Sequence, residues 1–340
     1  MLENPQIKED PFKLMYTYTT ACISSAVFGI DEKTWNTMET PFNEMAYQSV
    51  KPTFKFSLKF AISYISPKLY KLLNLKAFGE YEELFIEMMR KVMEKRRRDE
   101  KIYHDFIDIC LKLEDEGVIK DFVTGYETDV TIQLLAAQAF VFILAGIDSS
   151  ANALHFTLLE LSNNPKILQK LQEEIDEIFK NNGGNLVYED IDRLEYMEKV
   201  INEVMRKYPP IGSIQRRCCK ETILPVGGIK VEKDTIIFIP VYALHRDEKY
   251  FPNPDVFDPE RFSVKNLSNI VDYSYLPFGE GKRNCIGTRF ARIEMKAGLA
   301  WLLRKYTLKE QSYTPDHFEP SFFGIRDPSA YYEIIPRVDS

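Results

Sequence analysis

Apolar residues recur every three to four positions along most of the chain, which predicts a mainly helical protein. The clearest stripe runs from Tyr81 to Met93, where seven apolar residues recur at positions i, i+3, i+4, i+7, i+8, i+11 and i+12. Arg96, Arg97 and Arg98 follow this stripe, and we interpret them as a solvated helix end. The same periodicity predicts helices over 14–27, 106–113, 129–162, 197–208 and 295–304, and one from Pro165 to Asn181.

Strand patterns are short and lie mainly in the second half of the chain. Apolar runs at 223–226 and 229–231 flank two glycines and predict a hairpin, and the β-branched run 235–239 predicts another strand. The tail alternates weakly over 331–335, whereas the residues after Leu113 that hold Gly117 and Gly125 predict a loop. A few strands among many helices give an α+β fold class, mainly α.

The longest predicted helix starts at a Thr128 or Asp129 cap and stops at Asn163-Asn164-Pro165. Its densest apolar run, 134–147, contains a glutamine and is followed at once by polar residues, so it is too short and too polar to span a bilayer. We interpret it as a buried core helix. The first ten residues lack an apolar signal region, so we expect no signal or anchor in the chain as given.

Composition narrows the class of protein. A chain of 340 residues with 45% hydrophobic and 13% aromatic residues can bury a large core in one domain or two. The net charge of −7 argues against nucleic acid as a partner. Five cysteines without zinc-like or disulfide-framework spacing indicate reduced thiols in a cytosolic environment.

Residues 51–76 mix aromatic and aliphatic side chains with lysines. Such a mixture suits a membrane interface, because lysine stems lie along apolar surface while their charged heads stay in water. An ordinary lid over an apolar pocket explains the pattern equally well, and the two interpretations are compatible. The segment contains Lys51, Phe54, Lys55, Phe56, Lys59, Phe60, Tyr64, Lys68, Lys71 and Lys76.

The stretch 277–287, read as P-F-G-E-G-K-R-N-C-I-G, carries the strongest chemical signal. Gly279 and Gly281 can take positive φ and let a flat ligand approach the backbone. Cys285 is predicted at the mouth of the helix that follows. The helix dipole and the neighbouring Lys282 and Arg283 favour its thiolate, which is a good iron ligand.

Two further patterns within helices stand out. Gly146 in mid-helix costs about 1 kcal/mol against alanine, which indicates that something approaches the backbone closely there. Asp148 and Ser149 add an acid and an alcohol at the same place. Glu203 and Arg206 lie three residues apart, so they share a helix face and can form a charge-assisted pair.

These patterns together resemble the cytochrome P-450 family. The loop at 277–287 resembles its haem-binding loop through Phe278, Gly281, Arg283, Cys285 and Gly287. A-G-I-D-S-S at 145–150 resembles the family's oxygen-activation segment, E-V-M-R at 203–206 its Glu-x-x-Arg motif, and P-E-R-F at 259–262 a later motif. The four motifs follow the family's order, and the similarity extends more loosely over the whole chain.

The resemblance implies a single domain over residues 1–340 that acts as a haem-thiolate monooxygenase. Such an enzyme inserts one atom of O2 into an apolar small molecule, with electrons from NADPH through NADPH-cytochrome P-450 reductase. The cofactor is expected to be heme b, with Cys285 as the iron ligand that favours O–O cleavage. Asp148 and Ser149 would relay protons.

The resemblance assigns roles to further residues. The guanidinium groups of Arg216 and Arg283 are expected to contact the haem propionates, and Phe278 and Gly279 to belong to the cofactor site. A buried network of Glu203, Arg206 and Arg261 is expected to fix the fold around the haem. We interpret His245 as hydrogen-bonded structure rather than as a metal ligand.

The motifs resemble most the microsomal animal type, in the clan of xenobiotic-metabolising vertebrate and insect enzymes. This implies the cytosolic face of the endoplasmic reticulum membrane. Relative to the family, the chain is expected to begin partway through the fold, without the membrane anchor, first strands and haem-contacting tryptophan helix. Ser149 stands where threonine is usual and Lys282 where proline is usual.

Two alternative functions remain open: a haem-thiolate isomerase or dehydratase that needs no reductase, and an inactive truncated haem-binding paralogue. For the monooxygenase, Arg289, Arg292 and Lys296 recur at i, i+3 and i+7 and with Lys282 predict a basic face for the reductase. An ordinary solvated helix face is the alternative interpretation.

Overall fold

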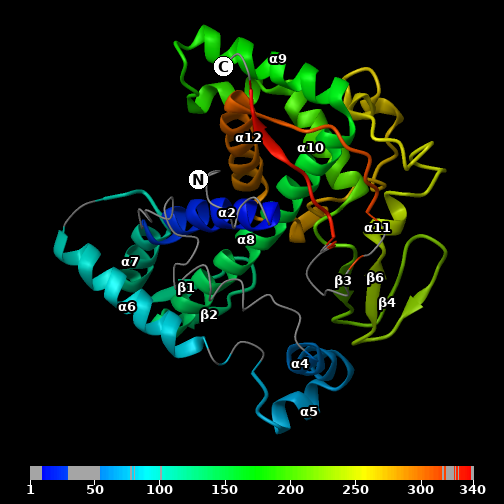
Figure 1. Ribbon diagram of the computed structural model, residues 1–340. Coiled ribbons are helices and arrows are strands. Elements are labelled where there is room, and N and C mark those ends of the chain that lie inside the picture. The colour runs from blue at the N-terminus through cyan, green and yellow to red at the C-terminus, as the bar shows by residue number, and fades with distance from the viewer. Residues whose placement is uncertain are drawn as a thin grey trace. The chain divides into compact units, whose positions relative to one another are not determined.

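A computed structural model (Figure 1) describes residues 10–29, 54–76, 79, 81–99, 102–315, 318, 325, 327 and 329–337. The chain divides into two compact units, Met1–Ala151 and Asn152–Ser340. Each unit is described by itself. Lys51 of the predicted lysine-rich segment lies outside the described residues, as do the side chains of Phe56, Phe60 and Tyr64.

The first unit is built mainly from helices. They are α2 (Pro11–Phe28), α4 (Phe54–Ile65), α5 (Pro67–Leu72), α6 (Glu82–Asp99), α7 (Phe106–Glu116) and the first part of α8 (Ile132–Asn163). As predicted, α2 ends at Gly29, which takes the left-handed conformation with φ 61°. The side chain of Asp10 caps its other end by accepting a hydrogen bond of 3.1 Å from the Lys13 amide.

The prediction of a solvated arginine end of α6 is wrong for Arg96, which is only 7% exposed. Its guanidinium lies 2.7 Å from a carboxylate oxygen of Asp105 and 2.7 Å from one of Asp108. Arg96 stands three residues after Met93, so it continues the apolar stripe and faces inward. Arg97 is exposed on the helix surface and pairs with Glu114 at 3.0 Å.

Two strands replace the loop predicted after α7. Strand β1 (Val118–Lys120) pairs antiparallel with β2 (Glu127–Asp129). Between them Asp121 accepts a hydrogen bond of 2.6 Å from the Thr124 hydroxyl, and Gly125 has a φ of 70°. The strands are too short to show alternation, so their pairing depends on this turn chemistry.

Helix α8 contains 32 residues and starts later than predicted. Thr128 and Asp129 belong to β2, and the cap is Thr131, whose hydroxyl accepts from the Leu134 amide at 3.2 Å. Residues 150–162 are all buried, whereas the run 134–147, interpreted from the sequence as a buried core helix, alternates buried residues with exposed ones such as Ala137, Val141 and Ala145. The core-helix interpretation is therefore only partly correct for that run. Contrary to the sequence argument, α8 is long and apolar enough to cross a membrane by length and composition, the one such helix among the described residues.

The second unit combines helices with small two-stranded sheets, three of them within its described residues. Its α-helices after α8 are α9 (Pro165–Asn181), α10 (Glu195–Lys207), α11 (Val241–Leu244) and α12 (Thr288–Lys305). Short 3-10 helices are η1 (Tyr188–Arg193), η2 (Pro259–Phe262), η3 (Leu267–Asn269) and η4 (Gly281–Arg283). In Figure 1, α12 runs beside α9 and α10, and these helices carry much of the unit's buried apolar core.

The strands largely follow the sequence pattern. The predicted hairpin is confirmed as β4 (Thr222–Ile223) paired with β5 (Lys230–Val231). Strand β6 (Ile236–Ile239) is also confirmed, and its partner β3 (Ile214–Arg217) was not predicted. The tail forms β8 (Ile334–Pro336) against β7 (Tyr306–Leu308), so the α+β class, mainly α, is confirmed.

Candidate functional site

The loop that contains Cys285 is closed by its own backbone. The amide of Cys285 donates to the carbonyl of Phe278 at 2.8 Å, and the amide of Asn284 donates to Gly281 at 3.2 Å. Gly279 and Gly281 have φ values of 70° and 80°, so both take the left-handed conformation that the sequence predicts. The loop thereby presents Cys285 as an exposed free thiol.

The helix after the loop starts farther from Cys285 than predicted. Helix α12 begins at Thr288 with Gly287 as its N-cap, so Cys285 stands two residues outside the cap. The Thr288 hydroxyl donates to the carbonyl of Cys285 at 2.9 Å, which joins the loop to the first helical residue. The backbone bonds of the loop therefore hold Cys285 at a position outside the first helical turn, where the helix dipole mainly acts.

Strand β3 lies against the same loop. The guanidinium of Arg216 donates to the carbonyl of Arg283 at 3.4 Å. A Cβ built on Gly279 would lie 3.6 Å from the Cδ1 atom of Ile214, an ordinary van der Waals distance, so the strand packs directly against the loop and the positive φ is what favours glycine here. The structure thus brings Arg216, Arg283 and Gly279 together. Phe278 is half-buried, with the Arg292 guanidinium 5.1 Å from its ring centroid.

Glu203 and Arg206 form a fully buried pair on α10, both with side chains 0% exposed. Arg206 donates from Nε at 2.7 Å and from its Nη2 atom at 2.8 Å to the two oxygens of Glu203. Arg261 of η2 lies 3.3 Å from the same carboxylate, and the amide of Asp258 donates to it at 3.0 Å. Burial raises the pKa of Glu203, and the arginine bonds oppose that rise.

His245 connects this pair to the Cys285 loop. Its backbone carbonyl accepts from Arg206 at 3.0 Å, and its imidazole Nε2 accepts from the amide of Leu276 at 2.8 Å. The residue is completely buried, and burial lowers the pKa of the imidazole to about 4, so the ring is neutral at pH 7. Sequence reasoning expected hydrogen-bonded structure here, but no pattern in the sequence indicated Leu276 as the partner.

The acid and the alcohol of the predicted oxygen-activation segment lie on α8 in the first unit. Asp148 is buried, and the Ser149 hydroxyl donates to the carbonyl of Ala145 at 2.7 Å. A Cβ on Gly146 would lie 2.9 Å from the Cδ1 atom of Ile23. The close approach that the sequence indicated at Gly146 is therefore made by α2.

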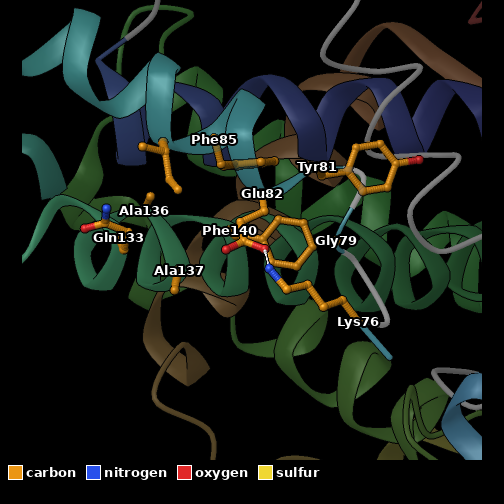
Figure 2. A pocket seen from close by; sticks show the side chains of 10 residues that line it. Lys76, Gly79, Tyr81, Glu82, Phe85, Gln133, Ala136, Ala137 and Phe140 are labelled. Atoms are coloured by element: carbon orange, nitrogen blue, oxygen red, sulfur yellow. Dashed lines mark hydrogen bonds and ion pairs between the residues drawn. The ribbon is translucent and has the colours of Figure 1, made fainter. Parts of the chain in front are cut away.

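A cavity of about 300 Å³ opens between α6 and α8 in the first unit (Figure 2). Its wall is mostly apolar, with Lys76 and Glu82 forming an ion pair at its edge. Lys76 ends the lysine-rich segment, which fits the lid interpretation of that segment. The apolar and aromatic lining comprises Tyr81, Phe85, Ile86, Ala136, Ala137 and Phe140.

The predicted basic face of α12 is wrong for two of its members. Lys296 is 5% exposed, donates to the carbonyl of Ile191 at 3.1 Å and pairs with Glu198 at 2.9 Å. Arg292 also pairs with Glu198. Helical spacing put these residues on one face, but it gave no indication that η1 and α10 cover that face.

Comparison with known proteins covers nearly the whole chain. The family model for cytochrome P450 matches residues 2–334. Probable cytochrome P450 6a13 of Drosophila melanogaster is 34% identical over 311 residues, which are 91% of this chain and 62% of the relative. Cytochrome P450 9e2 of Blattella germanica is 38% identical over 318 residues, which are 89% of this chain and 58% of the relative.

A mammalian relative shows the same extent of similarity. Cytochrome P450 3A12 of Canis lupus familiaris is 32% identical over 316 residues, which are 92% of this chain and 61% of the relative. The chain thus spans about three fifths of the length of the curated relatives that it matches. From these matches and the four motifs, the chain belongs to the cytochrome P450 family.

Proposed function

We propose that this chain carries the thiolate-ligand half of a haem monooxygenase, which inserts one atom of O2 into an apolar small molecule. The observation that supports this proposal best is the closed loop that exposes Cys285 beside two arginines. Electrons would come from NADPH through NADPH-cytochrome P450 reductase. The apolar cavity between α6 and α8 supports an apolar substrate, since drug-sized ligands favour pockets lined by aliphatic and aromatic side chains.

The residues of the loop fit heme b. Cys285 offers an exposed sulfur, the donor that haem-thiolate enzymes use. A Cβ on Gly281 would meet no atom within 4 Å, so the loop leaves room for a flat macrocycle beside its backbone. Arg216 and Arg283 supply guanidinium groups that can bind the two propionate carboxylates.

Bound haem would supply the iron chemistry that activates O2, with the Cys285 thiolate donating electron density to the metal. The chain's own tasks are to hold the sulfur, bind the propionates and move protons. The Ser149 hydroxyl donates to the Ala145 carbonyl and can return there after passing a proton onward. Asp148, buried one residue earlier, is the acid of that relay.

A membrane surface is the proposed location, on the cytosolic face of the endoplasmic reticulum. Phe54, Ile65 and Leu72 on α4 and α5 are 85%, 84% and 81% exposed, and Lys55 and Lys68 stand beside them. Exposed apolar side chains with lysines suit the boundary between headgroups and acyl chains. Near Cys285, the exposed Lys282 and Arg289 remain as basic groups for an acidic reductase surface.

One experiment separates this function from the alternatives. The purified chain is loaded with haem, reduced under carbon monoxide and then supplied with reductase and NADPH. A thiolate-type carbon monoxide band together with substrate-dependent NADPH consumption is expected. The same band without any NADPH consumption would contradict the monooxygenase and leave the two alternatives, an isomerase or dehydratase and an inactive haem-binding paralogue. Absence of the band would contradict the haem-thiolate assignment itself.

A further inference from the structure

His245 contacts two aromatic rings and is also held by hydrogen bonds. Its imidazole stacks on Tyr275 with ring centroids 5.3 Å apart and meets the edge of Phe251 at 6.1 Å. Full burial and these two rings fix the position and the tilt of the imidazole. Its acceptor nitrogen is therefore aimed in one direction only, at the amide of Leu276.

We propose that His245 is a positioning residue for the Cys285 loop. Its carbonyl is fixed by the buried Glu203–Arg206 pair, and its ring in turn fixes Leu276, the residue just before the loop. The proposal rests on the proposed function only in that Cys285 is taken as the cofactor ligand. His245 lies outside the four family motifs described above.

The transmission follows a continuous chain of hydrogen bonds. Arg206 holds the carbonyl of His245 at 3.0 Å, and His245 holds the amide of Leu276 at 2.8 Å. The carbonyl of Leu276 then accepts from the Gly279 amide at 3.1 Å, and two residues after Leu276 the carbonyl of Phe278 accepts from Cys285. The backbone of Leu276 is therefore bound at both its amide and its carbonyl. A shift at its amide would move the turn that carries the sulfur.

The chemistry requires a neutral ring with its proton on Nδ1, because Nε2 acts as the acceptor. The groups around the ring maintain that state. Tyr275 and Phe251 exclude water, and the cationic guanidinium of Arg206 disfavours a second positive charge beside it. Glu203 is already bound by Arg206. His245 thus remains an acceptor throughout the neutral pH range.

Two substitutions test the acceptor directly. Glutamine can place its side-chain oxygen near the position of Nε2, whereas leucine has no acceptor. His155→Leu is the matched control, because His155 is also buried in the second unit and its ring packs against Phe156 and Tyr332. Hydrogen exchange of the Leu276 amide is measured on the full chain without haem, at equal global stability set by added denaturant. The reduced carbon monoxide difference spectrum is then recorded after haem loading.

For His245→Leu we expect about tenfold faster exchange at Leu276, the size of one lost buried hydrogen bond, and a loss of the thiolate-type band. His245→Gln should restore both readouts, and His155→Leu should change neither beyond the loss of global stability. Equal exchange at Leu276 in all three variants would overturn the proposal. If none of the proteins, including the parent, gives a thiolate band, the proposed function fails while the exchange result still decides the role of His245.

Discussion

Each unit buries an arginine in an ion-pair cluster, and the two clusters differ in the backbone that they hold. In the first unit Arg96 is 7% exposed and lies 2.7 Å from both Asp105 and Asp108. In the second unit Arg206 is completely buried and makes two bonds to Glu203. The first cluster combines one guanidinium with two carboxylates, and the second combines one carboxylate with two guanidiniums, because Arg261 also lies 3.3 Å from Glu203. A desolvation penalty applies to both.

The difference lies in the backbone that each arginine binds next. Arg96 reaches the carbonyl of Phe28 at 3.5 Å, at the end of α2, so its cluster joins helix ends. Arg206 reaches the carbonyl of His245, whose ring holds Leu276 just before the Cys285 loop. A buried ion pair by itself therefore indicates only that two segments are joined. The further hydrogen bonds of its arginine show whether the pair also supports a functional site.

The largest effect is expected from Glu203→Ala, which leaves the guanidinium of Arg206 buried without its carboxylate. Breaking a buried pair costs about 3–5 kcal/mol of unfolding free energy. Urea denaturation should show this loss, with the thiolate-type carbon monoxide band disappearing in parallel. Glu114→Ala on the exposed surface is the control and should change the free energy of unfolding very little. Retention of the band in a folded Glu203→Ala protein would separate the cluster from the site.

A second effect comes from acid. Burial lowers the pKa of both His245 and His155 to about 4; the backbone of Arg206 and Met205 opposes the lowering at His245, and Asp327 opposes it at His155. Since the unfolded pKa is near 6.5, the unfolded state binds more protons below that pH. Each histidine therefore contributes about 3 kcal/mol of stability above pH 6.5, which is lost as the pH falls from 6.5 to 4.

Denaturant midpoints measured between pH 7 and pH 4 would reveal this loss. In His155→Gln the loss of stability between pH 7 and pH 4 that is due to the two histidines should be about half as large, because one of the two titrations is removed. An unchanged slope in that variant would show that other groups govern the acid sensitivity. In the His245→Gln variant the slope should change in the same direction.

A third, smaller effect is expected from Arg96→Met. Methionine fills the space, but Asp105 and Asp108 lose their cation, and we expect a loss of about 2–3 kcal/mol. Asp108 keeps the amides of Tyr103 and His104 as donors, which limits the loss. Thermal unfolding measures the change. The haem spectrum should stay normal, in contrast to Glu203→Ala, and a lost band would contradict the division between the two clusters.

The smallest effect on stability is expected from Cys285→Ser. Because the thiol is exposed, the free energy of unfolding should change by less than about 0.5 kcal/mol. The thiolate-type carbon monoxide band should nevertheless disappear, since a neutral hydroxyl cannot replace the electron donation of a thiolate. Cys219→Ser, at another exposed cysteine, is the matched control. A normal band in Cys285→Ser would refute the ligand assignment.

Local backbone conformation was predictable from the sequence wherever few residue types can adopt the conformation. The left-handed glycines at 279 and 281 and the end of α2 at Gly29 are examples, because positive φ strongly favours glycine. The burial of Arg96 was equally accessible, since it continues the stripe after Met93. The sequence pattern favoured a solvated end only because three arginines stand together.

What covers a helix face was not predictable. Spacing placed Arg292 and Lys296 on one face of α12, but periodicity does not reveal that Glu198 and the carbonyl of Ile191 lie opposite. The same limit applies to the bond between His245 and Leu276, whose partners are 31 residues apart. Such contacts depend on tertiary packing, and local pattern contains no information about it.

The close packing at Gly146 has a consequence for protein engineering. Alanine at a mid-helix glycine usually stabilises a protein, but at 146 its methyl group would lie 2.9 Å from the side chain of Ile23. Nearby, Thr19 donates to the carbonyl of Ile147 at 3.1 Å and fixes the same crossing. The sizes of residues 146 and 23 are therefore complementary, and a larger residue on α8 requires a smaller one on α2. Randomised libraries that vary the two positions together should recover paired exchanges of size, whereas libraries that vary 146 alone should return glycine.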